Sequence, residues 1–310
     1  YFGIRIQSGY SLGGEGPYIV YDPVSDYYYL DVTYGQITEG YNQRLFRSKD
    51  VTGPYVDITG KNGAVGEDVT NLDEYGVKIM GNYDFSNLSK GYKHGGHDSM
   101  IVVDGQLYNI YHQRFETGGN HQNRIHQMFR NEEGWPVMAV YENAGDQISE
   151  TGYALDEIVG DYEFVDHGTL TSSYMQDTLL VTLNADGTIT GDVEGTWGMT
   201  EGTYYMNAVI NGVTYKGVFY KQQDESGLKR QVMTFSAYGS NNTAIWGSRL
   251  STSDSDFEAV NAAAAKLSVP SSTSVDLPLR STGDFGTTVF WATSDASVIK
   301  ACGEITRADE

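Results

Sequence analysis

The chain has 310 residues, of which 39% are hydrophobic, and 41 acidic side chains against 20 basic ones give a formal net charge of −21. This charge opposes contact with phosphate backbones and argues against a nucleic-acid partner. No apolar run approaches the ~20 residues that cross a bilayer, and the lone Cys302 excludes a disulfide within the chain. We expect a monomeric, soluble protein that acts on a neutral or cationic partner.

Residues 1–150 are predicted to form short antiparallel strands. The expected strands are residues 1–6, 17–21, 27–34, 43–48, 99–103, 107–112, 124–130 and 137–141. The pair Asp104-Gly105 favours a two-residue hairpin turn between two of them. Repeated sets of three or four such strands are typical of propeller blades, although a β-sandwich has the same periodicity.

Residues 151–250 are predicted to form a separate β-barrel. The expected strands are residues 177–183, 204–210, 213–220 and 231–236, and Asn211-Gly212 favours a hairpin. Residues 251–310 begin with a polar linker, 251–255, followed by an Ala-rich helix at 256–267 and β-like segments at 275–279 and 289–292. The chain is therefore predicted to be all-β, with a third, unfinished module after the barrel.

Histidines provide the clearest chemical signal. Five of the six fall between positions 94 and 126: His94, His97, His112, His121 and His126. Histidines crowded on strand ends ligate metals or bind hydroxyls, although any one of them alone is more often a hydrogen-bonded structural residue. Their spacing does not match the His-Glu-x-x-His zinc signature.

Glu15 is the second signal. It lies among three glycines, Gly13, Gly14 and Gly16, directly before a predicted strand. Glycines let a backbone come close to a ligand, so a carboxylate in this setting is a candidate for acid–base chemistry, whereas a loop glutamate alone is usually only solvated.

These motifs, taken with others in the same order, resemble glycoside hydrolase family 43 and specifically its endo-arabinanases. The resemblance is carried by Gly14-Glu15-Gly16-Pro17-Tyr18-Ile19, Tyr27-Tyr28-Tyr29-Leu30, Thr33-Tyr34-Gly35, the segments 40–48 and 53–57, Gly96-His97-Asp98-Ser99, and the segments 111–115, 124–129 and 131–137. Residues 151–250 resemble the barrel appended to extracellular members, and 256–310 resemble the start of a bacterial Ig-like module.

The resemblance implies a partial five-bladed β-propeller, a substrate cleft across its axis, and hydrolysis of α-1,5-linked L-arabinan with inversion. It implies that Glu15 is the general acid. The general base and a tuning aspartate have no match here, and Asp31 and Asp98 are the nearest substitutes at non-matching positions. The chain alone is therefore expected to be inactive. Family members of this kind are extracellular, so a signal peptide is expected upstream.

The resemblance also implies that His97 reaches one hydrated calcium ion, and this sequence has Asp98 where the family commonly has Asn. Arg44, Arg124, His126 and Tyr34 are candidate sugar contacts, and each is equally compatible with a structural role. Two other functions stay open: an exo-acting arabinofuranosidase or xylosidase of the same family, and a non-catalytic carbohydrate-binding propeller.

Overall fold

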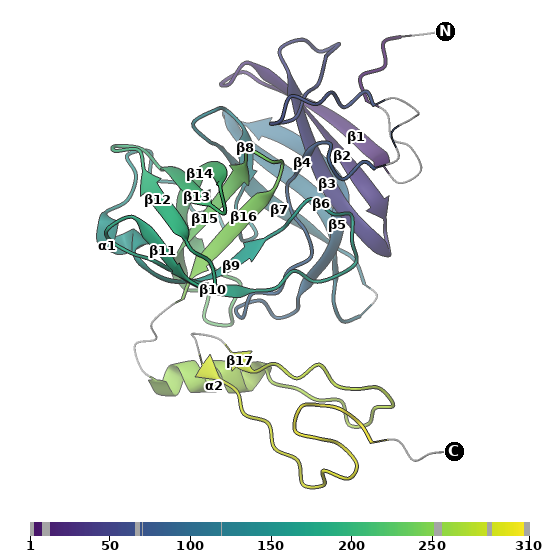
Figure 1. Ribbon diagram of the computed structural model, residues 1–310, viewed down its shortest axis with the longest axis vertical. Helices are drawn as coiled ribbons and strands as arrows, with labels where there is room; N and C mark the ends of the chain where they lie inside the picture. The colour runs from purple at the N-terminus through teal and green to yellow at the C-terminus, as the bar shows by residue number, and fades with distance from the viewer. Residues whose placement is uncertain are drawn as a thin grey trace.

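The computed structural model describes residues 3–7, 13–65, 69, 71–118, 120–250, 256–283 and 287–306. Within these ranges two four-stranded antiparallel sheets and a closed eight-stranded barrel are followed by a helix and a two-stranded sheet (Figure 1). The predicted all-β architecture with a barrel is confirmed.

Both four-stranded sheets are meanders in which each strand pairs with the next along the chain. The first consists of β1 (Gly13–Asp22), β2 (Tyr27–Gln36), β3 (Glu39–Ser48) and β4 (Val77–Lys78), and the second of β5 (Tyr92–Val103), β6 (Gln106–Phe115), β7 (Gln122–Arg130) and β8 (Pro136–Met138). Asp104 and Gly105 both have positive φ, as the hairpin prediction requires. The strand expected over residues 1–6 is wrong for its described part, residues 3–6, and residues 1 and 2 lie outside the described ranges.

Each sheet has the size of a propeller blade, but two sheets do not close a propeller. The five-bladed architecture therefore stays a prediction.

The barrel closes where its last strand pairs with its first, with Ile245 opposite Asp166. Its strands are β9 (Gly160–Asp166), β10 (Leu179–Leu183), β11 (Thr188–Gly191), β12 (Gly195–Met199), β13 (Tyr205–Ile210), β14 (Val213–Gln223), β15 (Gln231–Gly239) and β16 (Ala244–Arg249). A one-turn helix, α1 (Leu155–Ile158), precedes them. Positive φ at Asn211 and Gly212 confirms the predicted hairpin between β13 and β14.

The barrel wall nearest the sheets is buried on both faces. Along β14, Phe219 points into the barrel core, whereas its neighbours Val218 and Tyr220 join the core of the two sheets. On β16, Ile245 faces the barrel interior while Trp246 packs against the sheets. Because successive side chains of a strand point to opposite faces, the same strands supply both cores.

The segment after the barrel contains α2 (Asp256–Lys266), β17 (Thr282–Gly283) and β18 (Thr287–Thr288). The strands expected at 275–279 and 289–292 are wrong, because neither segment has a partner strand within the described residues. A segment with β-like composition becomes a strand only when it pairs with a neighbouring strand. The Ig-like module stays a prediction, as do the domain boundaries at 150 and 250.

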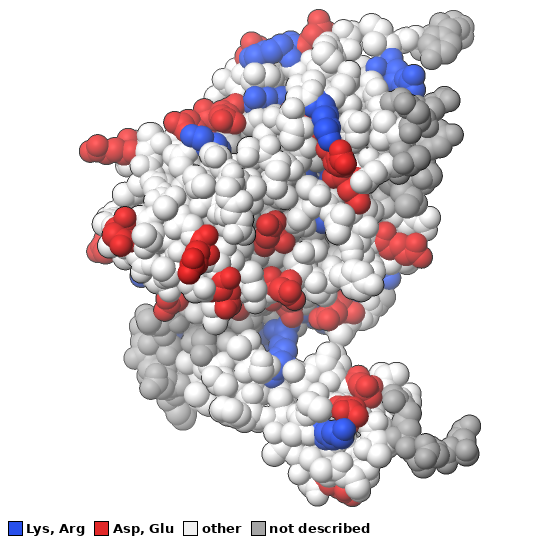
Figure 2. Space-filling model, in the orientation of Figure 1, with Lys and Arg blue, Asp and Glu red and all other residues white. Residues whose placement is uncertain are grey.

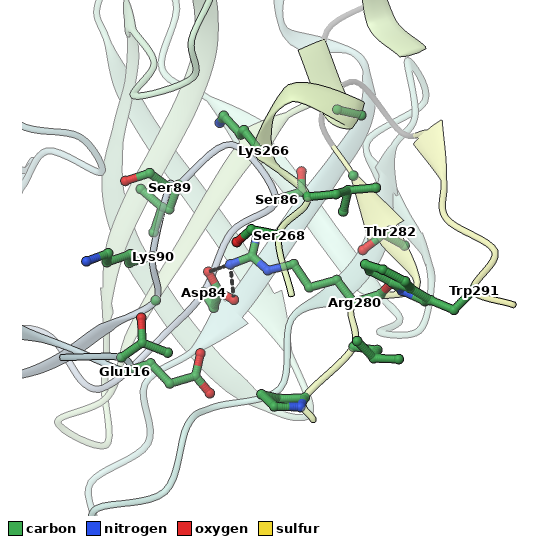
Figure 3. Close-up of a pocket in the computed structure, with 18 residues that line it drawn as sticks. Asp84, Ser86, Ser89, Lys90, Glu116, Lys266, Ser268, Arg280, Thr282 and Trp291 are labelled. Carbon is green, nitrogen blue, oxygen red and sulfur yellow. Dashed lines mark hydrogen bonds and ion pairs between the residues drawn. The ribbon is translucent and has the colours of Figure 1, made fainter. Parts of the chain in front are cut away.

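This last segment contacts the sheets beside a cavity of about 330 Å³ (Figure 3). Arg280 Nη2 lies 2.7 and 2.6 Å from the two carboxylate oxygens of Asp84 and crosses the cavity. Lys266 Nζ donates to the carbonyl oxygen of Asn87 at 3.3 Å. The lining residues do not include Glu15 or His97, so this cavity is separate from the candidate site.

Acidic side chains are scattered over the face shown in Figure 2, with basic ones between them. No extended basic surface appears on that face. Among the described residues, no helix combines the length and the apolar character needed to span a membrane.

Replacing Trp246 tests whether the barrel and the sheets share one core. Trp246 is fully buried, and its ring lies 5.2 Å from that of Tyr83 and 4.6 Å from that of His167. Trp246→Ala is expected to cost ~3–5 kcal/mol and to lower hydrogen-exchange protection in the barrel and in the sheets together. Leu180→Ala, at an exposed barrel position, is the control and should change stability by less than ~0.5 kcal/mol. Loss of protection confined to the barrel would contradict the shared core.

Candidate functional site

The candidate site is formed by two side chains that β1 and β5 bring together. Glu15, on β1, pairs in register with Thr33 of β2, and His97 lies in an irregular stretch of β5 opposite β6. His97 Nδ1 is 3.6 Å from Glu15 Oε1. More than half of each side chain is exposed, 58% for His97 and 56% for Glu15, so a ligand can reach both.

Glycines permit this close approach of the strands. Gly16 has a φ of +56°, and a Cβ placed on it would lie 3.3 Å from the His97 ring. A Cβ on Gly96 would lie 2.7 Å from both the Tyr41 ring and the Thr33 methyl group. His97 itself has a φ of 50°, in the left-handed region that few residues other than glycine occupy, although asparagine, aspartate and histidine are enriched there. Gly16, which follows Glu15, and Gly96, which precedes His97, thus leave room for this packing.

Tyr41 is the third member of the site, and sequence reasoning did not single it out. Its hydroxyl lies 3.5 Å from His97 Nδ1. Burial, followed by the negative charge of Glu15, raises the pKa of Tyr41. The Tyr41 ring stacks on His112 at 5.4 Å, and His112 stacks on His121 at 5.0 Å. Three of the clustered histidines therefore form a row of rings that begins beside Glu15.

A buried carboxyl pair lies behind the site. The backbone N–H of His97 donates to Thr33 Oγ1 at 2.8 Å, and Thr33 donates to Asp98 Oδ1 at 3.4 Å. Burial and the neighbouring Asp98 raise the pKa of Asp31 well above its usual range. Both side chains are almost completely buried. Neither reaches solvent, so neither is placed to activate a water molecule.

Arg44 and Tyr34 lie in the interior, away from solvent. Arg44 Nε donates to Asn42 Oδ1 at 2.7 Å, Nη1 donates to the carbonyl of Asp73 at 3.2 Å, and Nη2 donates to the carbonyl of Thr169. The guanidinium lies 5.2 Å from the centre of the Tyr34 ring, and burial lowers the pKa of Arg44 to about 10. Because the Arg44 guanidinium donates its hydrogen bonds to groups of the protein, this geometry favours a structural role for Arg44. Sugar binding by Arg44 or Tyr34 stays a prediction.

Arg124 and His126 lie on the side of the second sheet that faces the barrel. Both ring nitrogens of His126 have partners: Nε2 is 3.1 Å from the Tyr111 hydroxyl and Nδ1 is 2.9 Å from the carbonyl oxygen of Ala139. Arg124 Nε donates to the hydroxyl of Tyr92 at 2.8 Å. The structure therefore brings together Glu15 and His97. It gives Arg44, Arg124 and His126 hydrogen-bond partners within the protein, and it places the Tyr34 ring against the Arg44 guanidinium.

Comparison with known proteins shows which family this chain resembles. The family GH43_C, a C-terminal lipocalin-like domain, matches residues 140–247, the region of the barrel. A glycoside hydrolase family 43 protein from Bacillus licheniformis, of known structure, is 38% identical with a TM-score of 0.74, over 80% of this chain and 58% of that one. The resemblance of this chain to glycoside hydrolase family 43 is confirmed.

Two curated relatives show how far the similarity of this chain extends. The extracellular endo-α-(1→5)-L-arabinanase 2 of Bacillus subtilis is 38% identical over 80% of the chain, and the match spans 55% of the relative. The extracellular exo-α-(1→5)-L-arabinofuranosidase of Cellvibrio japonicus is 30% identical over only 39% of the chain and 32% of the relative. The chain thus spans about half the length of the endo-acting relative.

Gly16→Ala tests the close packing of β1 on His97. The added methyl group is expected to displace the His97 ring and to cost ~1–3 kcal/mol through the positive φ. Gly105→Ala is the matched control, because Gly105 also has a positive φ but a Cβ added to it would have no other atom within 4 Å. NMR of the histidine rings should show a shift of His97 in the first variant only. Equal spectra in the two variants would contradict the packing.

Proposed function

We propose that this chain is the part of a secreted arabinan-degrading hydrolase that carries the general acid, Glu15. The observation that supports this most strongly is a solvent-open carboxyl, 3.6 Å from His97, at a glycine-lined junction of two blade-sized sheets. The endo-acting relative matches 80% of the chain and the exo-acting one 39%, which favours endo action on α-1,5-linked L-arabinan. The two sheets would then be blades of a five-bladed propeller.

The proposed reaction inverts the anomeric carbon. An inverting hydrolase needs an acid that protonates the leaving oxygen and a base that activates water, with the two carboxyls ~6.5–9.5 Å apart. Glu15 faces solvent and can approach a glycosidic oxygen, whereas Asp31 and Asp98 are buried and cannot serve as the base. The resemblance to the family implies that the base and the tuning carboxylate lie outside this chain, so the isolated chain should not turn over arabinan.

Calcium at His97 is part of the same proposal. Calcium prefers oxygen ligands, and Asp98 is buried behind the site instead of facing it. Among the described residues, no group of three or more His, Cys, Asp or Glu side chains is arranged to hold a metal ion. The residues present therefore fit a largely hydrated ion that touches one imidazole, and not a protein cage. Such an ion would supply positive charge next to Glu15.

Three further features of the proposal rest on the resemblance and on the printed names of the relatives. We propose that the protein is extracellular, as those relatives are named. We propose that it is monomeric and that the segment after the barrel begins an Ig-like module.

Neutralising Glu15 in the protein expressed from its complete gene tests the acid assignment. The parent is expected to release reducing sugar from debranched arabinan, and Glu15→Gln is expected to lower kcat by about 10²–10⁴-fold, the usual contribution of a general acid. Asp104→Asn removes an exposed carboxylate at a hairpin tip and serves as the control with unchanged activity. A complete protein that binds arabinan without cutting it would sink the hydrolase proposal and leave a sugar-binding propeller. Turnover by the isolated 310-residue chain would overturn the claim that the base lies elsewhere.

Calcium binding is tested by titration of the chain with calcium, with magnesium as the comparison. The ring resonances of His97 should shift with calcium, and His97→Gln should abolish the binding isotherm. His121→Gln, at an exposed histidine of the same row, should leave the isotherm unchanged. Equal calcium binding by the two variants would contradict the assignment of His97 as a calcium contact.

A further inference from the structure

A loop of the barrel crosses to the two sheets. The residues between β9 and β10, 167–178, leave the barrel and run toward β3 and β5 (Figure 1). We refer to residues 167–178 as the strap. It contains no strand or helix, yet its backbone is held at several points by side chains of the sheets.

Two buried cations anchor the first half of the strap. Lys78 Nζ donates to the carbonyls of His167 and Leu170, each at 2.8 Å, and Arg44 Nη2 donates to the carbonyl of Thr169. Both cationic side chains are almost completely buried. A buried cation without such acceptors would be costly, so sheet and strap stabilise each other.

Asn82 holds the second half. Its Nδ2 donates to the carbonyls of Ser172 and Tyr174 at 3.2 and 3.1 Å, and its own carbonyl accepts from the N–H of Gln176 at 2.9 Å. The backbone on both sides of Tyr174 is therefore fixed. The Tyr174 side chain, in contrast, is 80% exposed.

The strap lies at the end of the sheets that carries Glu15. Glu15 pairs with Thr33 near the end of β2, and the turn between β2 and β3 follows directly. A Cβ on Gly40, at the start of β3, would lie 2.5 Å from the backbone nitrogen of Ser172. The N–H of Gly40 donates to His94 Nδ1 at 3.2 Å, and His94 N–H donates to Asn82 Oδ1 at 2.7 Å. Asn82, which fixes the backbone around Tyr174, thus also binds β5 at His94, three residues before His97 in the sequence.

We propose that the strap forms a wall of the substrate cleft and that Tyr174 is a stacking platform for a pentose unit of the polysaccharide, beyond the bond that is cleaved. An exposed aromatic ring on a fixed backbone loses little conformational freedom when a sugar packs on it. The face shown in Figure 2 has no basic patch that would select a charged ligand, and the ligand class that we propose is a neutral oligosaccharide. This inference rests on the proposed function of the Glu15 site.

The test compares Tyr174→Ala, Tyr174→Trp and the parent, all expressed from the complete gene, on α-1,5-arabino-oligosaccharides of increasing length. Tyr174→Ala is expected to raise KM about tenfold for long substrates, with kcat unchanged and the shortest substrate unaffected, and Tyr174→Trp should restore KM. Tyr21→Ala is the matched control, since Tyr21 is an exposed tyrosine near the opposite end of β1. A strap that only buttressed the sheets would give no dependence on substrate length.

Affinity electrophoresis of the 310-residue chain in gels containing debranched arabinan separates the two proposals. If arabinan retards the parent chain and Tyr174→Ala abolishes that retardation, the platform is supported. This holds even if the complete protein cleaves no arabinan, because then only the hydrolase proposal fails. Unchanged KM at every length and unchanged retardation, in a protein that cleaves arabinan through Glu15, would overturn the platform and leave the hydrolase proposal standing.

Discussion

The double burial of the barrel wall is the constraint on which the rest of the structure depends. Strands β14, β15 and β16 place alternate side chains in two different cores, one inside the barrel and one between the barrel and the sheets. Each face of such a strand removes apolar surface from water, at roughly 25 cal/mol per Å². The sheets are therefore not a separate unit to which the barrel is attached.

The strap follows from that arrangement. Because the barrel is packed against the sheets, the loop between β9 and β10 can reach Arg44 and Lys78, and its carbonyls satisfy two cations that the interior would otherwise not tolerate. The barrel thereby contributes to the end of the sheets that carries Glu15. This contact between the barrel and the sheets gives a physical reason for the barrel and the sheets to occur in one chain.

The site depends both on its polar side chains and on two glycines that leave space between the strands. Gly16 and Gly96 leave the space in which β1, β3 and β5 approach, and His97 adopts a positive φ whose backbone N–H is held by Thr33. Exposed Glu15 and His97 rest on a buried layer in which Asp31 and Asp98 lie behind Thr33. The candidate site is thus supported by a polar interior, where hydrogen bonds keep the geometry.

The sequence by itself determined the local features: alternating strands, the hairpins at Asp104-Gly105 and Asn211-Gly212, and the barrel. It also singled out Glu15 and His97, separately, through motifs that resemble a known family, whereas their contact is seen only in the structure. These features depend on backbone preferences and short-range patterns. Only the tertiary structure decided that Arg44 anchors the strap, that both nitrogens of His126 are satisfied inside, and that residues 275–279 form no strand. Those outcomes depend on which partner a side chain or strand meets across the fold, and a linear pattern of residues does not contain that information.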